Sequence, residues 1–472
     1  MRSDHNHRHS ITIIGGGFAG TLTAIKLLDA ATQPLDITIV ERRADLRRGV
    51  AYSTTEAVHL VNGPANIFSL HPDDPEHLAR WLTGNGAANG WQPPEDVAAS
   101  TPPRYLFGTY VRDELTRGIA DARERCTFRH IRSSATSLRS AANHVRVTLA
   151  NGDAIEADEM VLALGVFQAG LSAHEAPVSG HPAFAANPWD SAALDRLADG
   201  KDILVIGSSL SMVDAVASME ARGYRGSYQV ISRRGQFVES RRDAEPARDF
   251  LADRPLPATA RSLFSLVKAE RRAIAKAGAD WQGLPLAIRP YILPLWQKAS
   301  DRERLRFTRH LRAFWDVTAH RSAPDTHAAI ERAIGEARLS HRAARLIELA
   351  SDGDRILATI RTRCGVEALT FDGIIDCRGH QLHDWRRTAD PFVQSLLAAG
   401  EVRPHSTGFG IDATTDGALI SRDGHVHRNL SAIGHPLRGV AWESSSITEQ
   451  RAGDHACRSH PGKNNAFGTV AS

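Results

Sequence analysis

In the first forty residues, the pattern of apolar and polar positions predicts a strand, a helix and a second strand, in that order. Residues 11–14 form a short apolar run, a glycine-rich turn follows, and the apolar spacing over about 21–31 predicts an amphipathic helix. A second apolar run at 36–40 predicts another strand. A β-turn-α-β arrangement within about thirty residues has the size of one mononucleotide-binding unit.

The same order of elements returns in the middle of the chain. An apolar strand at 202–206 is followed by a turn at Gly207, a helix over 212–222 and a strand at 227–232. A segment rich in proline and alanine, 171–199, links this unit to what precedes it. Before that linker we predict helices near 75–82 and over 112–123, and strands at 127–132, 137–138, 144–150, 154–157 and 159–164.

The rest of the chain adds a helical insertion over about 240–335 and then further strands, at 339–341, 345–350, 355–362 and 371–376, with a closing helix at 446–458. We therefore predict an α/β fold with two Rossmann-like dinucleotide-binding domains and a helical insertion. The predicted boundaries are a flexible tail over 1–10, the first domain over 11–195, the second domain over 196–368, a return segment of the first domain over 369–458 and a flexible tail over 459–472.

The composition is that of an ordinary folded protein. Of the 472 residues, 42% are hydrophobic and 24% charged, which excludes disorder or a coiled coil as a description of the whole chain. The 57 Lys and Arg nearly balance the 54 Asp and Glu, so the net charge of +3 favours neither nucleic acid nor membrane as a partner. The apolar stretch 11–31 is interrupted by glycines and carries Lys26, which predicts neither a signal peptide nor a membrane span.

The cysteines lie too far apart for any C-x-x-C pair, at Cys126, Cys364, Cys377 and Cys457. Four cysteines are too few for a disulfide-built secreted fold, which favours a cytoplasmic location. The lack of a neighbouring pair excludes the reductases that relay electrons through two thiols. The 22 histidines show no helical ligand spacing with a third ligand, so no metal site is predicted.

The first glycine turn has the sequence Gly15-x-Gly17-x-x-Gly20 between a predicted strand and a predicted helix. The first glycine permits a tight turn, the second lets a pyrophosphate approach the helix N-terminus, and the third allows close helix–strand packing. Glu41 ends the second strand and can accept hydrogen bonds from ribose hydroxyls, but it would repel a 2′-phosphate. This unit should therefore hold FAD or NAD rather than NADP. A glycine turn that binds nothing is the alternative.

The second turn, Gly207-x-Ser209-x-x-Met212, has lost two of the three glycines. Its strand ends in Arg233 and Arg234, and positive charge there complements a 2′-phosphate, so NADPH is the expected second nucleotide. The alternative is a solvated strand end in an arginine-rich protein. Two further strand-to-glycine junctions end at Gly165 and Gly379, where the chain would pass between the nucleotide domains.

At this point the sequence resembles the flavoproteins with two dinucleotide-binding domains. Within them it is similar to the bacterial FAD/NAD(P)-binding proteins related to NADPH-dependent, N-hydroxylating flavin monooxygenases. The resemblance covers about residues 11–455 and rests on GGGFAG (15–20), RGVAYST (48–54), HLVNGPANIFSLHPDDPEHLARWL (59–82), ALG (163–165), VIGSSLSMVD (205–214), SRRG (232–235), DCRG (376–379) and AIGHPLRGVAWESSSITEQRA (432–452).

The resemblance implies that the first glycine turn and Glu41 contact the FAD adenosine and pyrophosphate. It implies that Asn62 lies towards the isoalloxazine and that Gly434, with the turn at 437–439, covers the flavin. The complete set of predicted cofactor-binding residues is Gly15, Gly17, Phe18, Ala19, Gly20, Glu41, Arg42, Tyr52, Asn62, Gly165, Gly207, Ser208, Ser209, Arg233, Arg234, Gly379, Gly434 and Leu437.

The function expected from the resemblance is that of an NADPH-dependent FAD monooxygenase. Reduced flavin would react with O2 to give a C4a-(hydro)peroxide, which would oxygenate a small amine- or heteroatom-bearing substrate. The insertion at 240–335 is the predicted substrate lid. Two alternatives remain open: a flavin-dependent reductase or dehydrogenase without oxygen insertion, and a non-catalytic nucleotide-binding protein. Catalytic side chains and oligomeric state are not predicted.

Overall fold

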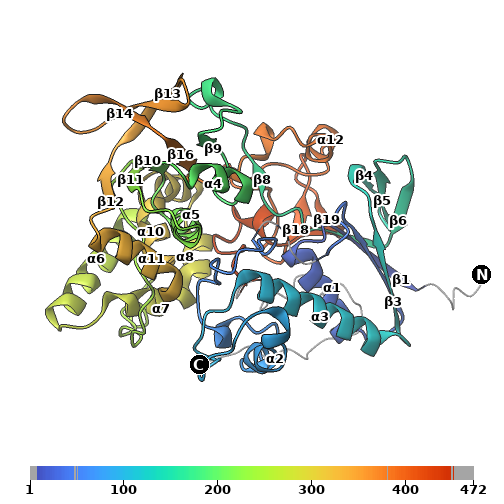
Figure 1. Cartoon of the computed structure of the whole chain (residues 1–472). Coiled ribbons are helices and arrows are strands. Elements are labelled where there is room, and N and C mark those ends of the chain that lie inside the picture. The colour runs from blue at the N-terminus through green and yellow to red at the C-terminus, as the bar shows by residue number, and fades with distance from the viewer. Residues whose placement is uncertain (1–7, 47–48, 50, 380, 448–449, 451–472) are drawn as a thin grey trace, which may run out of the picture.

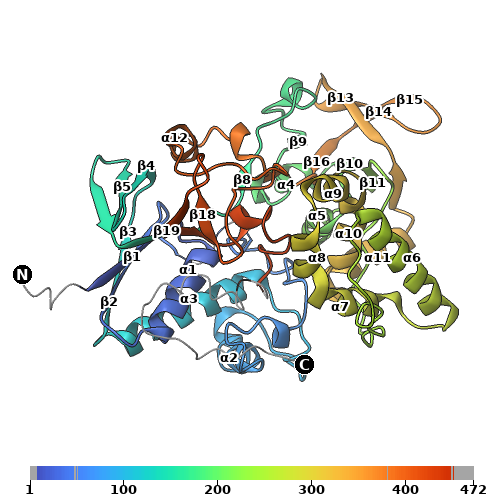
Figure 2. The same ribbon diagram turned by 180° about the vertical axis from the view of Figure 1, so that it is seen from behind.

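The structure is a computed structural model that describes residues 8–46, 49, 51–379, 381–447 and 450. Two parallel sheets lie towards opposite ends of the molecule, and a group of helices packs beside the second sheet (Figures 1 and 2). The predicted α/β class is confirmed. Among the described residues, no helix has the length and apolar character needed to cross a membrane.

The first sheet is built around the N-terminal strand. In spatial order it contains β18 (Ala418–Ile420), β19 (Val426–Ala432), β7 (Glu159–Leu162), β1 (His9–Ile14), β2 (Leu35–Val40) and β3 (Cys126–Ile131). All neighbours are parallel except the β18–β19 pair. One face is covered by α1 (Phe18–Ala30) and α3 (Arg104–Ala122), which pack against each other. The other face packs on α12 (Pro391–Ala399) and a small antiparallel sheet of β4 (Ala135–Ser140), β5 (Val145–Leu149) and β6 (Ala154–Ala157).

The second sheet repeats this plan. Its parallel strands, in spatial order, are β12 (Leu339–Ala343), β11 (Ser227–Ser232), β10 (Asp202–Ile206), β16 (Gly373–Asp376) and β9 (Phe184–Ala185). One face is covered by α5 (Leu210–Ala221) and α11 (Pro324–Gly335). The other face packs on an antiparallel sheet of β13 (Arg345–Asp352), β14 (Arg355–Arg361) and β15 (Val366–Phe371).

The insertion is helical, as predicted, and has a small apolar core of its own. Its helices are α6 (Ala260–Lys276), α7 (Leu284–Ile288), α8 (Ile292–Lys298), α9 (Asp301–Arg306) and α10 (Arg312–Ala319). A π-helical segment, Phe307–Leu311, joins α9 to α10. Figure 2 shows these helices grouped beside the second sheet, with α8 turned towards the centre of the molecule.

Several predicted boundaries need correction. Strand β1 begins at His9, inside the predicted flexible tail, because Ser10 donates a hydrogen bond to Asp158 (2.7 Å) and aligns the chain beside β7. Helix α3 begins at Arg104 rather than at 112. The predicted linker 171–199 contributes β9 and a helix, α4 (Ser191–Leu197). Almost all of the predicted closing helix 446–458, and the whole tail 459–472, lie outside the described residues.

Candidate functional site

The first glycine turn is shaped by close backbone contacts. Gly15 has a φ of 108°, and a Cβ added there would lie 2.4 Å from the carbonyl oxygen of Ala163. A Cβ on Gly20 would lie 1.9 Å from the carbonyl oxygen of Gly15. Gly17 precedes α1 and has no such crowding, since its added Cβ would meet Gly49 at 3.4 Å. Gly15 and Gly20 are therefore needed by the chain itself, whereas a Cβ on Gly17 would make only an ordinary contact with Gly49.

Glu41 follows β2 and is fixed by backbone donors. Its carboxylate accepts hydrogen bonds from the backbone N–H groups of Gly16 and Arg43, both at 3.0 Å. Each oxygen keeps a second lone pair for a ligand hydroxyl. Arg42, the next residue, is exposed. The carboxylate is thus held at the edge of the glycine turn, where an adenosine ribose lies in a dinucleotide unit.

Aromatic rings and a distant loop gather at the start of α1. The ring centroids of Phe18 and Tyr52 lie 5.5 Å apart, and Tyr52 lies 4.9 Å from Phe107. Burial raises the pKa of the Tyr52 phenol. Gly434 has a φ of 78°, and its added Cβ would lie 3.3 Å from the Cβ of Ala19. The structure therefore brings these predicted site residues together although they are separated by hundreds of positions.

Two other predicted site residues, Asn62 and Leu437, differ in their burial and contacts. Asn62 is half-buried, and its amide makes no hydrogen bond within the described part of the chain, so it stays available to a ligand. Leu437 is 5% exposed and belongs to the apolar core beneath the first sheet. Its side chain packs the protein interior, so only its backbone can face a cofactor.

The second unit repeats the geometry of the first. Gly207 has a φ of 114°, and its added Cβ would lie 2.6 Å from the carbonyl oxygen of Cys377. Ser209 precedes α5 and makes no side-chain cap, which leaves the N-terminal N–H groups of that helix free of a side-chain acceptor. The hydroxyl of Ser208 instead donates to the carbonyl oxygen of Gln236. The position of the third glycine is taken by Met212, whose side chain is fully buried.

The two strand-to-glycine junctions meet between the sheets. Gly165 and Gly379 follow β7 and β16 and have φ values of 65° and 85°. The next segments, β8 (Phe167–Gln168) and β17 (Gln381–Leu382), pair with each other as an antiparallel ladder. The chain therefore crosses between the two sheets twice, side by side.

The arginines at the end of β11 have different surroundings. Arg234 donates a hydrogen bond to the carbonyl oxygen of His310 (3.0 Å), and its guanidinium lies 5.1 Å from the ring centroid of Phe314. Arg233 is exposed and contacts no hydrogen-bond or ion-pair partner among the residues that the structure describes. Arg234 thus ties the strand to the insertion, while Arg233 is the freer cation.

A buried polar junction connects the two units and was not predicted from the sequence. Arg104 donates to both oxygens of Asp214 on α5, at 2.6 and 3.1 Å. The indole N–H of Trp189 donates to the same carboxylate at 2.9 Å. His59 lies 2.8 Å from the hydroxyl of Ser218, also on α5, and burial lowers the pKa of this histidine. The family-like segment 59–82 contains His59, which contacts the nearby Thr54 hydroxyl through Nδ1 (2.7 Å) and the distant Ser218 through Nε2.

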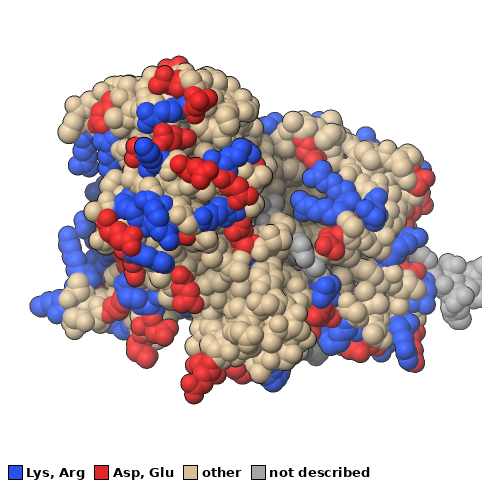
Figure 3. All heavy atoms as spheres, viewed as in Figure 1, with Lys and Arg blue, Asp and Glu red and all other residues tan. Residues whose placement is uncertain are grey.

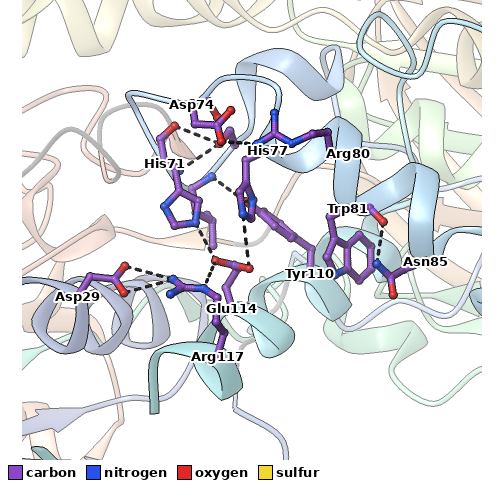
Figure 4. A network of polar contacts seen from close by, with 12 residues as sticks. Asp29, His71, Asp74, His77, Arg80, Trp81, Asn85, Tyr110, Glu114 and Arg117 are labelled. Carbon is purple, nitrogen blue, oxygen red and sulfur yellow. Dashed lines mark hydrogen bonds and ion pairs between the residues drawn. The ribbon is translucent and has the colours of Figure 1, made fainter. Parts of the chain in front are cut away.

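A second polar network holds the loop before α2 (His77–Asn85) against α3 (Figure 4). His71 Nε2 lies 2.7 Å from Glu114 Oε2, which also accepts from Arg117 Nε at 3.1 Å. His77 Nδ1 lies 2.9 Å from the hydroxyl of Tyr110. The nitrogen and oxygen atoms of His71, His77 and Glu114 lie within 4.8 Å of one another, a potential metal cluster that the sequence spacing did not indicate. Arg117 pairs with the same carboxylate, so Glu114 ties the loop before α2 to α3.

The residues of the first turn suit a dinucleotide. Its pyrophosphate would meet the N–H groups of the first turn of α1, which carries no acidic residue and no capping side chain. Helix α5 offers the same arrangement in the second unit. On the face shown in Figure 3, basic and acidic side chains are intermixed.

Comparisons with known proteins agree with this geometry. Residues 12–167 match a family described as FAD-NAD(P)-binding. No curated protein sequence matches the chain significantly. Among solved structures, the ornithine N-hydroxylase of Kutzneria sp. 744 is 14% identical with a TM-score of 0.60, covering 96% of this chain and 99% of that one. The L-lysine 6-monooxygenase of Pseudomonas syringae is 18% identical with a TM-score of 0.60 and the same coverage.

A third similar structure is the FAD-bound cadaverine monooxygenase of Erwinia amylovora, with 12% identity, a TM-score of 0.61 and 99% coverage of both chains. The chain shares the fold of these monooxygenases. The resemblance inferred from the sequence motifs is thereby confirmed at the level of the fold.

Proposed function

We propose that the protein is an FAD-containing, NADPH-dependent oxidoreductase, and specifically a monooxygenase. The observation that carries the proposal is the pair of glycine turns built in the same way, at Gly15 and Gly207. One turn is flanked by a carboxylate at Glu41 and the other by the guanidinium of Arg233, so two different dinucleotides are expected. The fold shared with FAD- and NADP-bound structures supports the same conclusion.

Each residue would bind or orient a cofactor. The N–H groups after Gly17 would receive the FAD pyrophosphate, Glu41 would hold the adenosine ribose, and Asn62 would lie against the isoalloxazine. Ser209 would admit the NADPH pyrophosphate, and Arg233 would bind its 2′-phosphate. When bound, NADPH supplies a hydride and FAD supplies electron transfer and oxygen activation. The protein contributes alignment of the two rings and exclusion of water.

The domain boundaries and substrate class belong to this proposal. We assign 11–195 and 369–458 to the FAD domain and 196–368 to the NADPH domain. Within the predicted insertion 240–335, the part before α11 is assigned to a lid over the substrate, because α11 covers the second sheet. The names of the similar structures specify ornithine, lysine and cadaverine, which favours a small amine- or heteroatom-bearing substrate here. A cytoplasmic location is proposed from the dispersed cysteines, of which the three described are free thiols.

Rapid mixing of the purified protein with reduced nicotinamides, first without and then with O2, tests the proposal. We expect a yellow protein that is reduced faster by NADPH than by NADH. When substrate is present, the protein should oxidise NADPH faster than it releases peroxide. Prompt peroxide release under all conditions, with fast transfer to an added electron acceptor, would favour a reductase instead. A colourless protein that does not take up FAD would indicate a non-catalytic nucleotide-binding protein.

A further inference from the structure

Arg438 carries a buried guanidinium that has no carboxylate partner among the described residues. The residue follows the 3-10 turn η8 (His435–Leu437) and is 9% exposed. Its Nε is buried without a hydrogen bond, and no carboxylate of the described chain lies within ion-pair distance of it. The guanidinium lies 4.4 Å from the ring centroid of Trp442, and burial lowers the pKa of Arg438 to about 10. Burying such a cation without a partner is costly, so a ligand that bears negative charge is expected beside it.

The surrounding groups are mostly hydrogen-bond donors. Arg312 on α10 brings a second guanidinium, 5.3 Å from the ring centroid of Phe409 and 6.0 Å from that of Trp442. It donates to His383 Nε2 at 3.2 Å, so the neutral ring of His383 carries its proton on Nδ1, which is buried and unpartnered. The indole Nε1 of Trp442 is also buried and finds no hydrogen-bond partner in the described part of the chain. Three unmatched donors, one each from Arg438, Trp442 and His383, therefore belong to one cluster.

The histidines add donors without adding charge. The rings of His383 and His435 stack with centroids 5.3 Å apart and an interplanar angle of 16°. Burial and the nearby arginines lower the pKa of His383 to about 2 and that of His435 to about 3. Both rings are therefore neutral, and the positive charge of the cluster is carried by Arg438 and Arg312.

The neighbouring acids do not neutralise Arg438. Asp316 Oδ2 lies 3.3 Å from the Nε of Arg312, one helical turn away, and its Oδ1 is buried without a partner. Glu443 accepts a hydrogen bond from the indole of Trp315 at 2.8 Å. Both carboxylates act on Arg438 only through longer-range attraction, which opposes the fall of its pKa.

The loops that carry the cluster pack closely on each other, and Arg438 lies four residues after Gly434, which the resemblance implies covers the flavin. An added Cβ on Gly410 would lie 1.9 Å from the carbonyl oxygen of Pro436, so the two loops that carry Phe409 and Arg438 are interlocked. A Cβ added to Gly434, four residues before Arg438, would lie 3.3 Å from the Cβ of Ala19 at the N-terminus of α1. Trp442 also lines an apolar cavity of about 70 Å³ with side chains of the insertion that include Trp296, Phe307 and Trp315.

We propose that Arg438, with Arg312 and the indole N–H of Trp442, binds the carboxylate of the substrate, an inference that rests on the proposed oxidoreductase function. The guanidinium fork matches the two oxygens of a carboxylate. The alternative acceptors for the same donors are the pyrimidine oxygens of the flavin.

Titration of the FAD-loaded protein with benzoate, and with uncharged benzamide as the matched probe, tests the proposal. Binding is followed by quenching of tryptophan fluorescence. We expect wild type to bind benzoate more tightly than benzamide, and Arg438→Gln to weaken benzoate binding by about tenfold or more without changing benzamide binding. Arg438→Lys should give an intermediate value, and Arg146→Gln, which alters an exposed ion pair with Glu156, should change nothing.

The reduction potential of the bound flavin, measured without benzoate, distinguishes the two acceptors. If Arg438→Gln lowers the potential and leaves benzoate binding unchanged, the guanidinium serves the flavin and the carboxylate proposal is wrong. Yellow, NADPH-reducible protein that shows no preference for benzoate over benzamide also overturns the carboxylate proposal but leaves the function intact. Protein that does not retain FAD contradicts the function itself.

Discussion

At the scale of single residues, the glycines of the first turn differ in what requires them. We expect the fold to require Gly20 and the bound ligand to require Gly17. Gly20→Ala would place a methyl group 1.9 Å from a carbonyl oxygen, whereas Gly17→Ala meets only an ordinary contact at 3.4 Å. We expect Gly20→Ala to unfold at a much lower temperature than wild type. We expect Gly17→Ala to lose tenfold or more in FAD affinity while the stability of the FAD-free protein changes by less than about 1 kcal/mol.

Thermal unfolding and FAD titration of both variants check this prediction. Gly84→Ala is the control, because Gly84 lies in α2 with open space around its Cα. If Gly17→Ala retained FAD as tightly as wild type, the pyrophosphate would have to bind elsewhere and the assignment of the first turn would be wrong.

At the scale of elements, the two arginines at the end of β11 are expected to have different roles. We assign cofactor selection to Arg233 and attachment of the insertion to Arg234. Arg233 is free of the insertion, whereas Arg234 donates to the carbonyl oxygen of His310. We expect Arg233→Ala to lower the preference for NADPH over NADH by about tenfold, since one charge-assisted contact to a phosphate is lost. Arg234→Ala should leave that preference closer to the wild-type value and make the insertion more susceptible to proteolysis.

Steady-state kinetics with both nicotinamides and limited proteolysis measure the two effects. Equal losses of NADPH preference in the two variants would mean that both arginines bind the phosphate. An unchanged preference in Arg233→Ala would remove the basis for the 2′-phosphate site.

Elements defined by local patterns could be predicted from the sequence, and elements defined by distant pairing could not. Strands β6, β10 and β11 lie where the apolar runs and turns place them. The two-residue strands β8 and β17 have no local signature, because each exists only through a partner more than two hundred residues away. Helix α12 was missed although its signals are present: Asp390 caps it, Pro391 begins it and Gly400 ends it.

The same reasoning applies to the candidate site. The glycine turns and Glu41 are close in sequence, so their spacing alone revealed them. The Arg438 cluster was not foreseen as a unit, because its side chains come from four separated segments, at 312, 383, 409 and 435–442. Only packing of the insertion against the C-terminal loops brings them together.

At the scale of the whole molecule, buried neutral histidines should make stability depend on pH. Burial lowers the pKa of His59, His327 and His405 below the ordinary value of 6.5. The unfolded chain binds protons at these positions below pH 6.5 while the folded chain resists them, so stability is greatest above that pH and falls as the pH is lowered. We expect the unfolding temperature to drop between pH 7 and pH 5, and to drop less in His327→Gln. A flat profile for wild type would show that these side chains are hydrated.

The buried ion pair between the two units should contribute strongly to the free energy that holds the units together. Asp214 and Arg104 have side chains that are 4% and 11% exposed, and Trp189 donates to the same carboxylate. Asp214→Asn leaves the guanidinium of Arg104 buried without its counter-charge, which costs about 3 kcal/mol, whereas Glu156→Gln at an exposed ion pair costs less than about 1 kcal/mol. Denaturant unfolding of the two variants measures the difference. Because α5 carries Asp214 and also begins at the second glycine turn, loosening this contact should slow flavin reduction by NADPH even at saturating nucleotide. Equal stability of Asp214→Asn and wild type would mean that the two units are held together by apolar contacts instead.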